Sequence, residues 1–151
     1  MSNKKILVTG GAGYVGTTLV PILLELNYKV LVVDTFWFGN YLPKHKNLKI
    51  IKKNILSLKE NDLNGIESVI HLASIANDTI ANLDPKLNWE ISCLGTKYLC
   101  DLAKINNVKK FIYASSSTVY GLKKEKKVNE VLSCKPISDY NKTKIVAEKN
   151  C

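Results

Sequence analysis

The chain has 151 residues, 46% hydrophobic and 23% charged, an ordinary composition for a single globular domain. Its net charge is +9, and all of its basic residues are lysines. The chain therefore has no arginine guanidinium group that could form bidentate hydrogen bonds with phosphate or guanine. We therefore expect no nucleic-acid partner. The four cysteines show no Cys-x-x-Cys spacing and no apolar run reaches membrane-spanning length. These patterns predict no metal site, no membrane segment and a cytoplasmic, reduced location.

A glycine-rich stretch, Thr9–Gly16, follows the apolar run 6–8 and precedes a helix-period pattern that reaches Leu26. Glycines here allow a tight turn, close approach of the backbone to a phosphate, and close packing of helix on strand. The helix N-terminus then offers N–H groups and a positive dipole end to an anion. The stretch predicts a dinucleotide pyrophosphate site, and the alternative is an ordinary glycine-rich turn. Pro21, inside the helical pattern, predicts a kink.

The second apolar run, residues 29–33, is rich in β-branched side chains and ends at Asp34. Such runs are typical of parallel strands that are buried on both faces. A carboxylate at this place accepts hydrogen bonds from the adenosine ribose hydroxyls, whereas it repels a 2′-phosphate. Asp34 therefore favours NAD over NADP. The alternative is an aspartate that serves only as a turn or cap residue.

Apolar runs and helical patterns alternate along the rest of the chain. Further strands are expected at 48–51, 68–73 and 110–114, and a long helix is expected from Pro85 to Ile105 with Asp84 as its N-cap. This alternation predicts an α/β fold with a doubly wound parallel sheet of the Rossmann type. Ligands of such sheets bind outside the carboxyl ends of the strands. Those ends carry the residues Gly10, Asp34, Asn54, Ala73 and Ser115–Ser117.

Hydroxyl, phenol and ammonium groups follow the fifth expected strand. Tyr140 and Lys144 are four residues apart and share a helix face, where an ammonium group favours the phenolate. With a serine hydroxyl to orient a substrate alcohol or carbonyl, these groups suit proton transfer coupled to hydride transfer. The alternative is that Tyr-x-x-x-Lys is only a pair on a helix surface.

The chain resembles the N-terminal portion of an extended short-chain dehydrogenase/reductase of the NAD-dependent epimerase/dehydratase family, whose members act on nucleotide-linked sugars. The resemblance spans nearly the whole chain in family order. It rests on the motifs at Thr9–Gly16, Asp34, His71–Ser74, Gly95-Thr96, Tyr113–Gly121 and Tyr140-x-x-x-Lys144.

This resemblance implies a catalytic Ser116, a catalytic Tyr140 and a Lys144 that binds the nicotinamide ribose. Asn54 and Ile55 would flank the adenine, and His71 would be structural. The cofactor-binding residues implied for NAD are Gly10, Gly13, Tyr14, Val15, Gly16, Asp34, Asn54, Ile55, Leu72, Ala73, Ser74, Ser92, Ala114, Tyr140 and Lys144.

Three departures from the family pattern stand out. Asn54 replaces the usual aspartate, although its amide oxygen can still accept from the adenine amino group, and Ser92 stands where asparagine is common. Family members are also about twice as long as this chain. We therefore expect residues 1–151 to be an incomplete NAD-binding Rossmann domain, with the last strands and the C-terminal substrate domain absent, weak NAD binding and incomplete turnover.

The reaction type can be narrowed from the resemblance. Sugar dehydratases of this kind place an Asp-Glu pair after the catalytic hydroxyl residue, but Ser117 and Thr118 stand here and cannot act as carboxylic acids. We expect an epimerase that oxidises a sugar hydroxyl transiently and reduces it again. The alternatives are a reductase or dehydratase, and a non-catalytic dinucleotide-binding module. The resemblance also implies a homodimer that pairs through the helices at 85–105 and 139–150.

Overall fold

The structure, a computed structural model, describes residues 4–151. The chain forms two compact units. The first unit contains residues 4–73 and 98–114, and the second contains residues 74–97 and 115–151.

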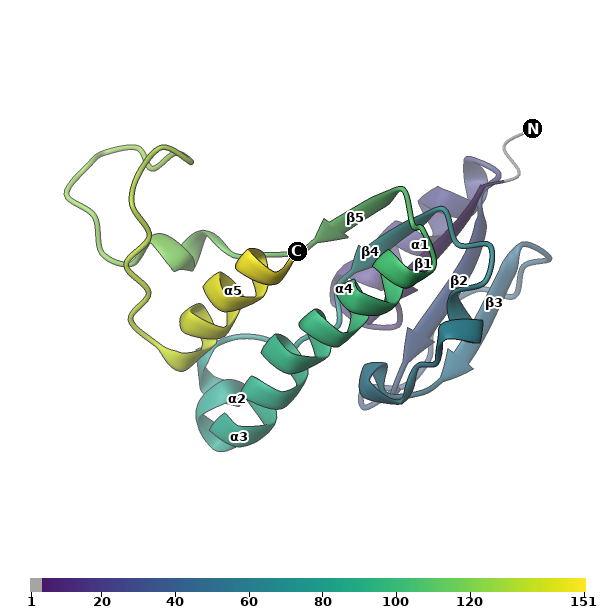
Figure 1. Cartoon of the computed structure of the whole chain (residues 1–151), viewed down its shortest axis with the longest axis horizontal. Helices are drawn as coiled ribbons and strands as arrows, with labels where there is room; N and C mark the ends of the chain where they lie inside the picture. The colour runs from purple at the N-terminus through teal and green to yellow at the C-terminus, as the bar shows by residue number, and fades with distance from the viewer. Residues whose placement is uncertain (1–3) are drawn as a thin grey trace. The chain divides into compact units, whose positions relative to one another are not determined.

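A five-stranded sheet forms the centre of the first unit. All four strand pairings are parallel, and the strand order is β3-β2-β1-β4-β5 (Figure 1). This order is the one found in doubly wound dinucleotide-binding folds, and it confirms the predicted fold class. The strands are Lys5–Thr9 (β1), Lys29–Asp34 (β2), Leu48–Lys52 (β3), Ser68–His71 (β4) and Lys110–Tyr113 (β5).

The central strands β1 and β2 are buried on both faces, as their apolar runs predict. Helix α1 (Tyr14–Glu25) packs against one face, where Val20 and Leu23 join a core cluster with Val8 and Val32. The helix continues through Pro21. It stops because Asn27 adopts the left-handed conformation, with φ of 61°, a conformation that asparagine tolerates.

The expected helix at 85–105 is correct in extent but not in form. Asp84 caps its start by accepting a hydrogen bond from the Leu87 amide at 2.9 Å, and Pro85 takes the first position. A π-helical turn then interrupts the regular hydrogen bonding, and such turns are uncommon in helices. The segment therefore consists of α3 (Pro85–Asn88), the π-helical turn (Trp89–Leu94) and α4 (Gly95–Ile105).

The other elements of the second unit are short helices and one longer helix. The short helix α2 (Asp78–Leu83) was not expected from the sequence, and Asn77 caps it with its side-chain oxygen. A 3₁₀ turn spans Ser117–Tyr120. Helix α5 (Asp139–Asn150) begins at Ser138, whose hydroxyl accepts a hydrogen bond from the Asn141 amide at 3.2 Å. Helix α5 is the expected carrier of Tyr140 and Lys144.

Candidate functional site

The turn between β1 and α1 requires glycine for reasons of packing. Gly10 has φ of 70°, and a Cβ atom there would lie 2.6 Å from the backbone nitrogen of Ala73. Gly16 lies so close to the carbonyl group of Gly11 that no side chain fits between them. The turn therefore lies directly against the carboxyl end of β4, and α1 lies directly against the turn. Any side chain at Gly10 or Gly16 would push these backbone segments apart.

The N-terminus of α1 has no side-chain cap. Its N-cap residue is Gly13, and no acidic residue lies in the first turn. The first N–H groups of a helix have no partner within the helix, and they carry the positive end of the helix dipole. Tyr14 is 96% exposed at this point. Backbone N–H groups at Tyr14, Val15 and Gly16 therefore form a site that is suited to an anion such as a pyrophosphate.

Asp34 lies at the carboxyl end of β2, and backbone groups fix its carboxylate. Oδ2 accepts a hydrogen bond from the Ala12 amide at 2.9 Å, and Oδ1 accepts one from the Phe36 amide at 2.8 Å. These bonds tie the aspartate to the glycine turn. Each carboxylate oxygen can accept a second hydrogen bond, so the group can still bind a ribose hydroxyl. Its turn-forming role and its predicted binding role are therefore compatible.

Asn54 and Ile55, which are predicted to flank the adenine, already make contacts within the protein that the sequence does not predict. The Asn54 side-chain oxygen accepts a hydrogen bond from the Leu56 amide at 2.9 Å and caps a short 3₁₀ turn. The Ile55 side chain is buried. Asn54 therefore acts first as a capping residue, and only the second lone pair of its oxygen is left for an adenine amino group.

At the carboxyl ends of β4 and β5, the predicted site residues Leu72 and Ala114 form backbone hydrogen bonds within the sheet. The Leu72 amide donates to the Thr9 carbonyl at 2.9 Å, and the Ala114 amide donates to the His71 carbonyl at 3.1 Å. His71 itself is fully buried, and its Nδ1 lies 2.6 Å from the Thr9 hydroxyl. This contact agrees with the structural role that the sequence assigns to His71.

Ser74 and Ser92 form an internal pair in the second unit. Their hydroxyl oxygens are 3.1 Å apart, and Ser92 also accepts a hydrogen bond from the Ile75 amide at 3.0 Å. Ser92 is completely buried within the π-helical turn. Its hydroxyl therefore holds the start of the second unit in place, which is a use that the sequence does not predict.

Ser116 belongs to a chain of side-chain hydrogen bonds that sequence reasoning missed. Its hydroxyl oxygen lies 2.8 Å from that of Thr118, and the Thr118 hydroxyl donates to the side-chain oxygen of Asn141. Because the Thr118 proton is directed to Asn141, Ser116 donates its own proton to Thr118. The Ser116 oxygen also accepts from the Thr118 amide at 3.3 Å. The chain fixes the orientation of the Ser116 hydroxyl and leaves its oxygen as an acceptor.

Tyr140 and Lys144 are neighbours on α5, as their spacing predicts. The Lys144 ammonium nitrogen lies 5.6 Å from the centroid of the Tyr140 ring. Lys144 is 4% exposed. Burial lowers the pKa of Lys144 from 10.5 to about 8, although the nearby Glu148 carboxylate opposes this shift. A cation with this pKa, next to a phenol, can favour the phenolate and take part in proton exchange near neutral pH.

Glu148 also contacts the segment that follows β5. The Ser115 hydroxyl donates to its carboxylate across 33 residues of sequence. Glu148 lies one helical turn after Lys144, so one carboxylate interacts both with the serine segment and with the buried cation. No sequence pattern indicates this contact, because Ser115 belongs to the Tyr113–Gly121 motif but Glu148 lies outside every motif that the sequence shows.

The predicted site residues therefore fall into two groups. The glycine turn, Asp34, Asn54, Ile55, Leu72, Ala73 and Ala114 belong to the first unit, whereas Ser74, Ser92, Ser116, Tyr140 and Lys144 belong to the second. Within residues 4–151, no group of three or more histidine, cysteine, aspartate or glutamate side chains could hold a metal ion. In the same part of the chain, no helix combines the length and apolar character that a bilayer crossing requires.

Comparison with known proteins gives matches that span both units. A model of the NAD dependent epimerase/dehydratase family matches residues 6–151. A UDP-glucose 4-epimerase from Cyamopsis tetragonoloba is 30% identical over 165 residues, which cover 100% of this chain and 47% of that protein.

Two solved structures are similar over almost the whole chain. The UDP-N-acetylglucosamine 4-epimerase from Methanobrevibacter ruminantium M1 has a TM-score of 0.92 and 31% identity, covering 99% of this chain and 49% of that one. The UDP-glucuronic acid 4-epimerase from Bacillus cereus, in complex with UDP-glucuronic acid and NAD, has a TM-score of 0.87 and 31% identity, covering 97% and 51%. The chain spans about half the length of these relatives.

Proposed function

Because the chain belongs to the NAD dependent epimerase/dehydratase family, we propose that it carries the cofactor-binding and proton-transfer residues of a nucleotide-sugar epimerase. The observation that carries the proposal is the buried Lys144 ammonium beside the Tyr140 ring, 5.6 Å from its centroid. The solved epimerases that resemble the chain support a uridine-diphosphate sugar as substrate and C4 as the reacting carbon.

The first unit fits a dinucleotide. Gly10 and Gly16 leave room that a side chain would fill, the uncapped α1 offers N–H groups for the pyrophosphate, and Asp34 is oriented toward the turn by the Ala12 amide. When bound, NAD supplies a reversible hydride acceptor. The Asp34 carboxylate binds the adenosine ribose and disfavours a 2′-phosphate, so the cofactor is NAD and not NADP.

The second unit supplies the proton transfer. Tyr140 removes the proton from the sugar hydroxyl as it is oxidised, and it returns a proton when the ketone is reduced from the opposite face. Lys144 stabilises the phenolate form of Tyr140 and binds the nicotinamide ribose. Ser116 orients the sugar oxygen, and its position depends on Thr118 and Asn141. Ser117 and Thr118 provide no carboxylic acid for eliminating water, which favours epimerisation over dehydration.

The pairing of two copies through residues 85–105 and 139–150 is a further part of the proposal. Leu94 and Val146 lie in these segments and expose apolar surface, with 58% and 36% of their area accessible. Light scattering of the purified chain tests it, since a molecular mass near twice 16.9 kDa is expected for the dimer. A monomeric mass that does not change with concentration would contradict it.

The cofactor proposal is tested by Tyr14→Pro, with Tyr14→Ala as its matched control. Proline at the first helical position removes one N–H group without straining the helix, and alanine keeps that N–H. A hydrogen bond to a charged group contributes about 1.5–3 kcal/mol. We expect calorimetry to show NAD binding weakened about tenfold or more by proline and unchanged by alanine. Equal affinities for all three proteins would contradict a pyrophosphate at this helix end.

The reaction type is tested separately. The protein is incubated with NAD and UDP-glucose, and the products are separated by chromatography. Formation of the C4 epimer without net change in NADH absorbance supports the epimerase, and stoichiometric consumption of NADH indicates a reductase. Binding of NAD without any sugar exchange would contradict turnover by residues 1–151, and dinucleotide binding would then be the only activity of this chain.

A further inference from the structure

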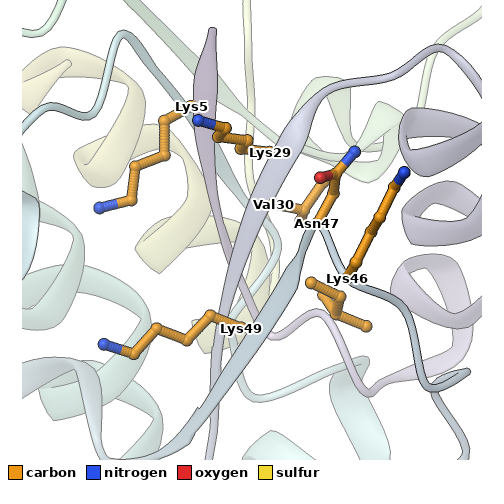
Figure 2. A pocket seen from close by; sticks show the side chains of 7 residues that line it. Lys5, Lys29, Val30, Lys46, Asn47 and Lys49 are labelled. Carbon is orange, nitrogen blue, oxygen red and sulfur yellow. The ribbon is translucent and has the colours of Figure 1, made fainter. Parts of the chain in front are cut away.

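A lysine-lined hollow lies at the amino ends of β1, β2 and β3, the opposite edge of the sheet from the glycine turn. Its volume is about 190 Å³, enough for several water molecules at about 30 Å³ each. Lys5, Lys29, Lys46 and Lys49 line it together with Asn47 (Figure 2). The Asp34 and glycine-turn residues take no part in this hollow.

The register of the sheet places three of these lysines on one face. Lys5 pairs directly with Lys29 on the neighbouring strand, and paired residues of parallel strands direct their side chains to the same side. Lys49 pairs with Leu31, which is two residues after Lys29 and so on the same face. In Figure 2 the side chains of Lys5 and Lys49 extend toward one side of the strands, whereas that of Lys46 extends toward the other. Like charges in such positions repel each other, which destabilises the sheet edge unless an anion lies between them.

Within residues 4–151, no ion pair joins a carboxylate to Lys5, Lys29, Lys46 or Lys49. The ion pairs found in the described chain use other lysines, such as Lys4 with Glu67 at 2.9 Å and Lys53 with Asp62 at 2.6 Å. The Lys5 ammonium group donates a hydrogen bond to the carbonyl oxygen of Asn64 at 3.1 Å. This bond gives one N–H group of the lysine an acceptor, but the carbonyl carries no negative charge. Lys29, Lys46 and Lys49 are exposed. Acidic residues elsewhere therefore leave a local excess of positive charge at the hollow.

We propose that this hollow binds a compact, multiply charged phosphate anion, of the kind present in inorganic tripolyphosphate or in the triphosphate group of a nucleotide. Lysine ammonium groups on flexible stems bind phosphates as point charges and do not require the bidentate geometry of arginine. The small volume suits a compact anion better than a polymer. The lining contains no aromatic residue on which a base could stack, so recognition rests on the phosphates.

The test is a calorimetric titration of the full chain with inorganic tripolyphosphate at low ionic strength. The double variant Lys29→Gln/Lys49→Gln removes two charges from the hollow. The control Lys126→Gln/Lys127→Gln removes two charges from an exposed loop and gives the same net charge. We expect at least tenfold weaker binding for the first variant and less than a twofold change for the second. Equal losses in both would overturn the proposal, because the binding would then reflect net charge alone.

Three further measurements distinguish other sources of binding. Tripolyphosphate that is displaced by NAD, or lost in Tyr14→Pro, would occupy the helix α1 N-terminus instead and would overturn the proposal. Binding to single-stranded DNA that strengthens steadily with polymer length, and is weakened more by Lys29→Gln/Lys49→Gln than by the control, would assign the hollow to nucleic acid and would overturn the proposal. A nucleoside triphosphate that binds no more tightly than tripolyphosphate would support recognition of the phosphates alone. This site does not depend on the proposed epimerase function, so the two proposals can fail separately.

Discussion

The Lys144 ammonium nitrogen lies 5.6 Å from the centroid of the Tyr140 ring, one helical turn away on α5, and the lysine is almost completely buried. Burial of a cation costs stability and lowers its pKa. Burial of Lys144 therefore suits its proposed role beside the Tyr140 phenol, but it lowers the stability of the folded protein. This conflict between stability and proposed function can be measured.

Lys144→Met is expected to stabilise the protein at neutral pH. The pKa of Lys144 is about 8 in the folded state and 10.5 as the ordinary value, which corresponds to about 3 kcal/mol. Because the folded pKa is the lower one, the unfolded chain binds the extra proton between pH 8 and 10.5, so stability rises with pH in that window. The full cost of the charge is present below about pH 8. Urea unfolding should therefore show the largest gain for Lys144→Met at pH 7, shrinking toward pH 10.5.

The control for this prediction is Lys142→Met, two residues away on the same helix. Lys142 is exposed and pairs with Asp139 at 3.2 Å, so its loss should change stability by less than about 1 kcal/mol at any pH. A pH-independent gain for Lys144→Met would show that packing, and not the charge, is responsible.

Gly10→Ala is expected to destabilise the protein more than Gly65→Ala. Both glycines have left-handed backbones, with φ of 70° and 71°, which cost alanine about 1–2 kcal/mol. Gly65 has open space around it, whereas a methyl group at Gly10 would meet the backbone of Ala73. Overpacking adds about 1–3 kcal/mol at Gly10 alone. Chemical denaturation of both variants measures the difference, and similar losses would mean that the turn can move away from β4.

Thr118 and Asn141 are expected to be energetically coupled. The Thr118 hydroxyl donates to the Asn141 side chain, which is buried, so removing either group leaves the other without this bond. A double-mutant cycle with Thr118→Val and Asn141→Ala should give a coupling of about 0.5–3 kcal/mol in unfolding free energy. Additive losses would show that the hydrogen bond between Thr118 and Asn141 does not contribute to stability.

Asn88→Leu is expected to leave stability unchanged or to increase it. Asn88 is completely buried in α3, and neither polar atom of its side chain has a hydrogen-bond partner among residues 4–151. A buried unsatisfied polar group costs about 1–3 kcal/mol, which leucine of similar volume avoids. The control is Asn106→Leu, because Asn106 donates to the Leu102 carbonyl at 3.0 Å and should lose stability. A large loss in Asn88→Leu would indicate that a bound water or ligand satisfies the amide.

Asp34→Asn is expected to weaken the preference for NAD over NADP. The substitution removes the charge that repels a 2′-phosphate but keeps an oxygen for the backbone amides of Ala12 or Phe36. Competitive binding should show the ratio of NAD to NADP affinity falling by about tenfold, or about 1.4 kcal/mol. An unchanged ratio would mean that Asp34 serves only the turn.

Local sequence patterns were sufficient to predict the fold class and the main strand, turn and helix that carry the candidate site. The β-branched run at 29–33, the glycines at 10–16 and the helical spacing of Tyr140 and Lys144 identify strand, turn and helix, and the sheet confirms the predicted fold class. These features are local because side-chain period and glycine content depend only on neighbouring residues. The π-helical turn at Trp89–Leu94 was missed, since its residues follow an ordinary helical pattern.

The partners of these residues follow from the way distant segments of the chain pack together. The Asp34 carboxylate accepts hydrogen bonds from the Ala12 and Phe36 amides. The Thr118 hydroxyl donates to the side chain of Asn141, 23 residues later in the chain, and Lys144 is buried. Periodicity gives the face of an element on which a side chain lies, but it does not give the group that packs against that face. The family pattern and the candidate residues could therefore be predicted from local motifs, whereas hydrogen-bond partners, burial and the pKa of Lys144 depend on contacts between distant segments.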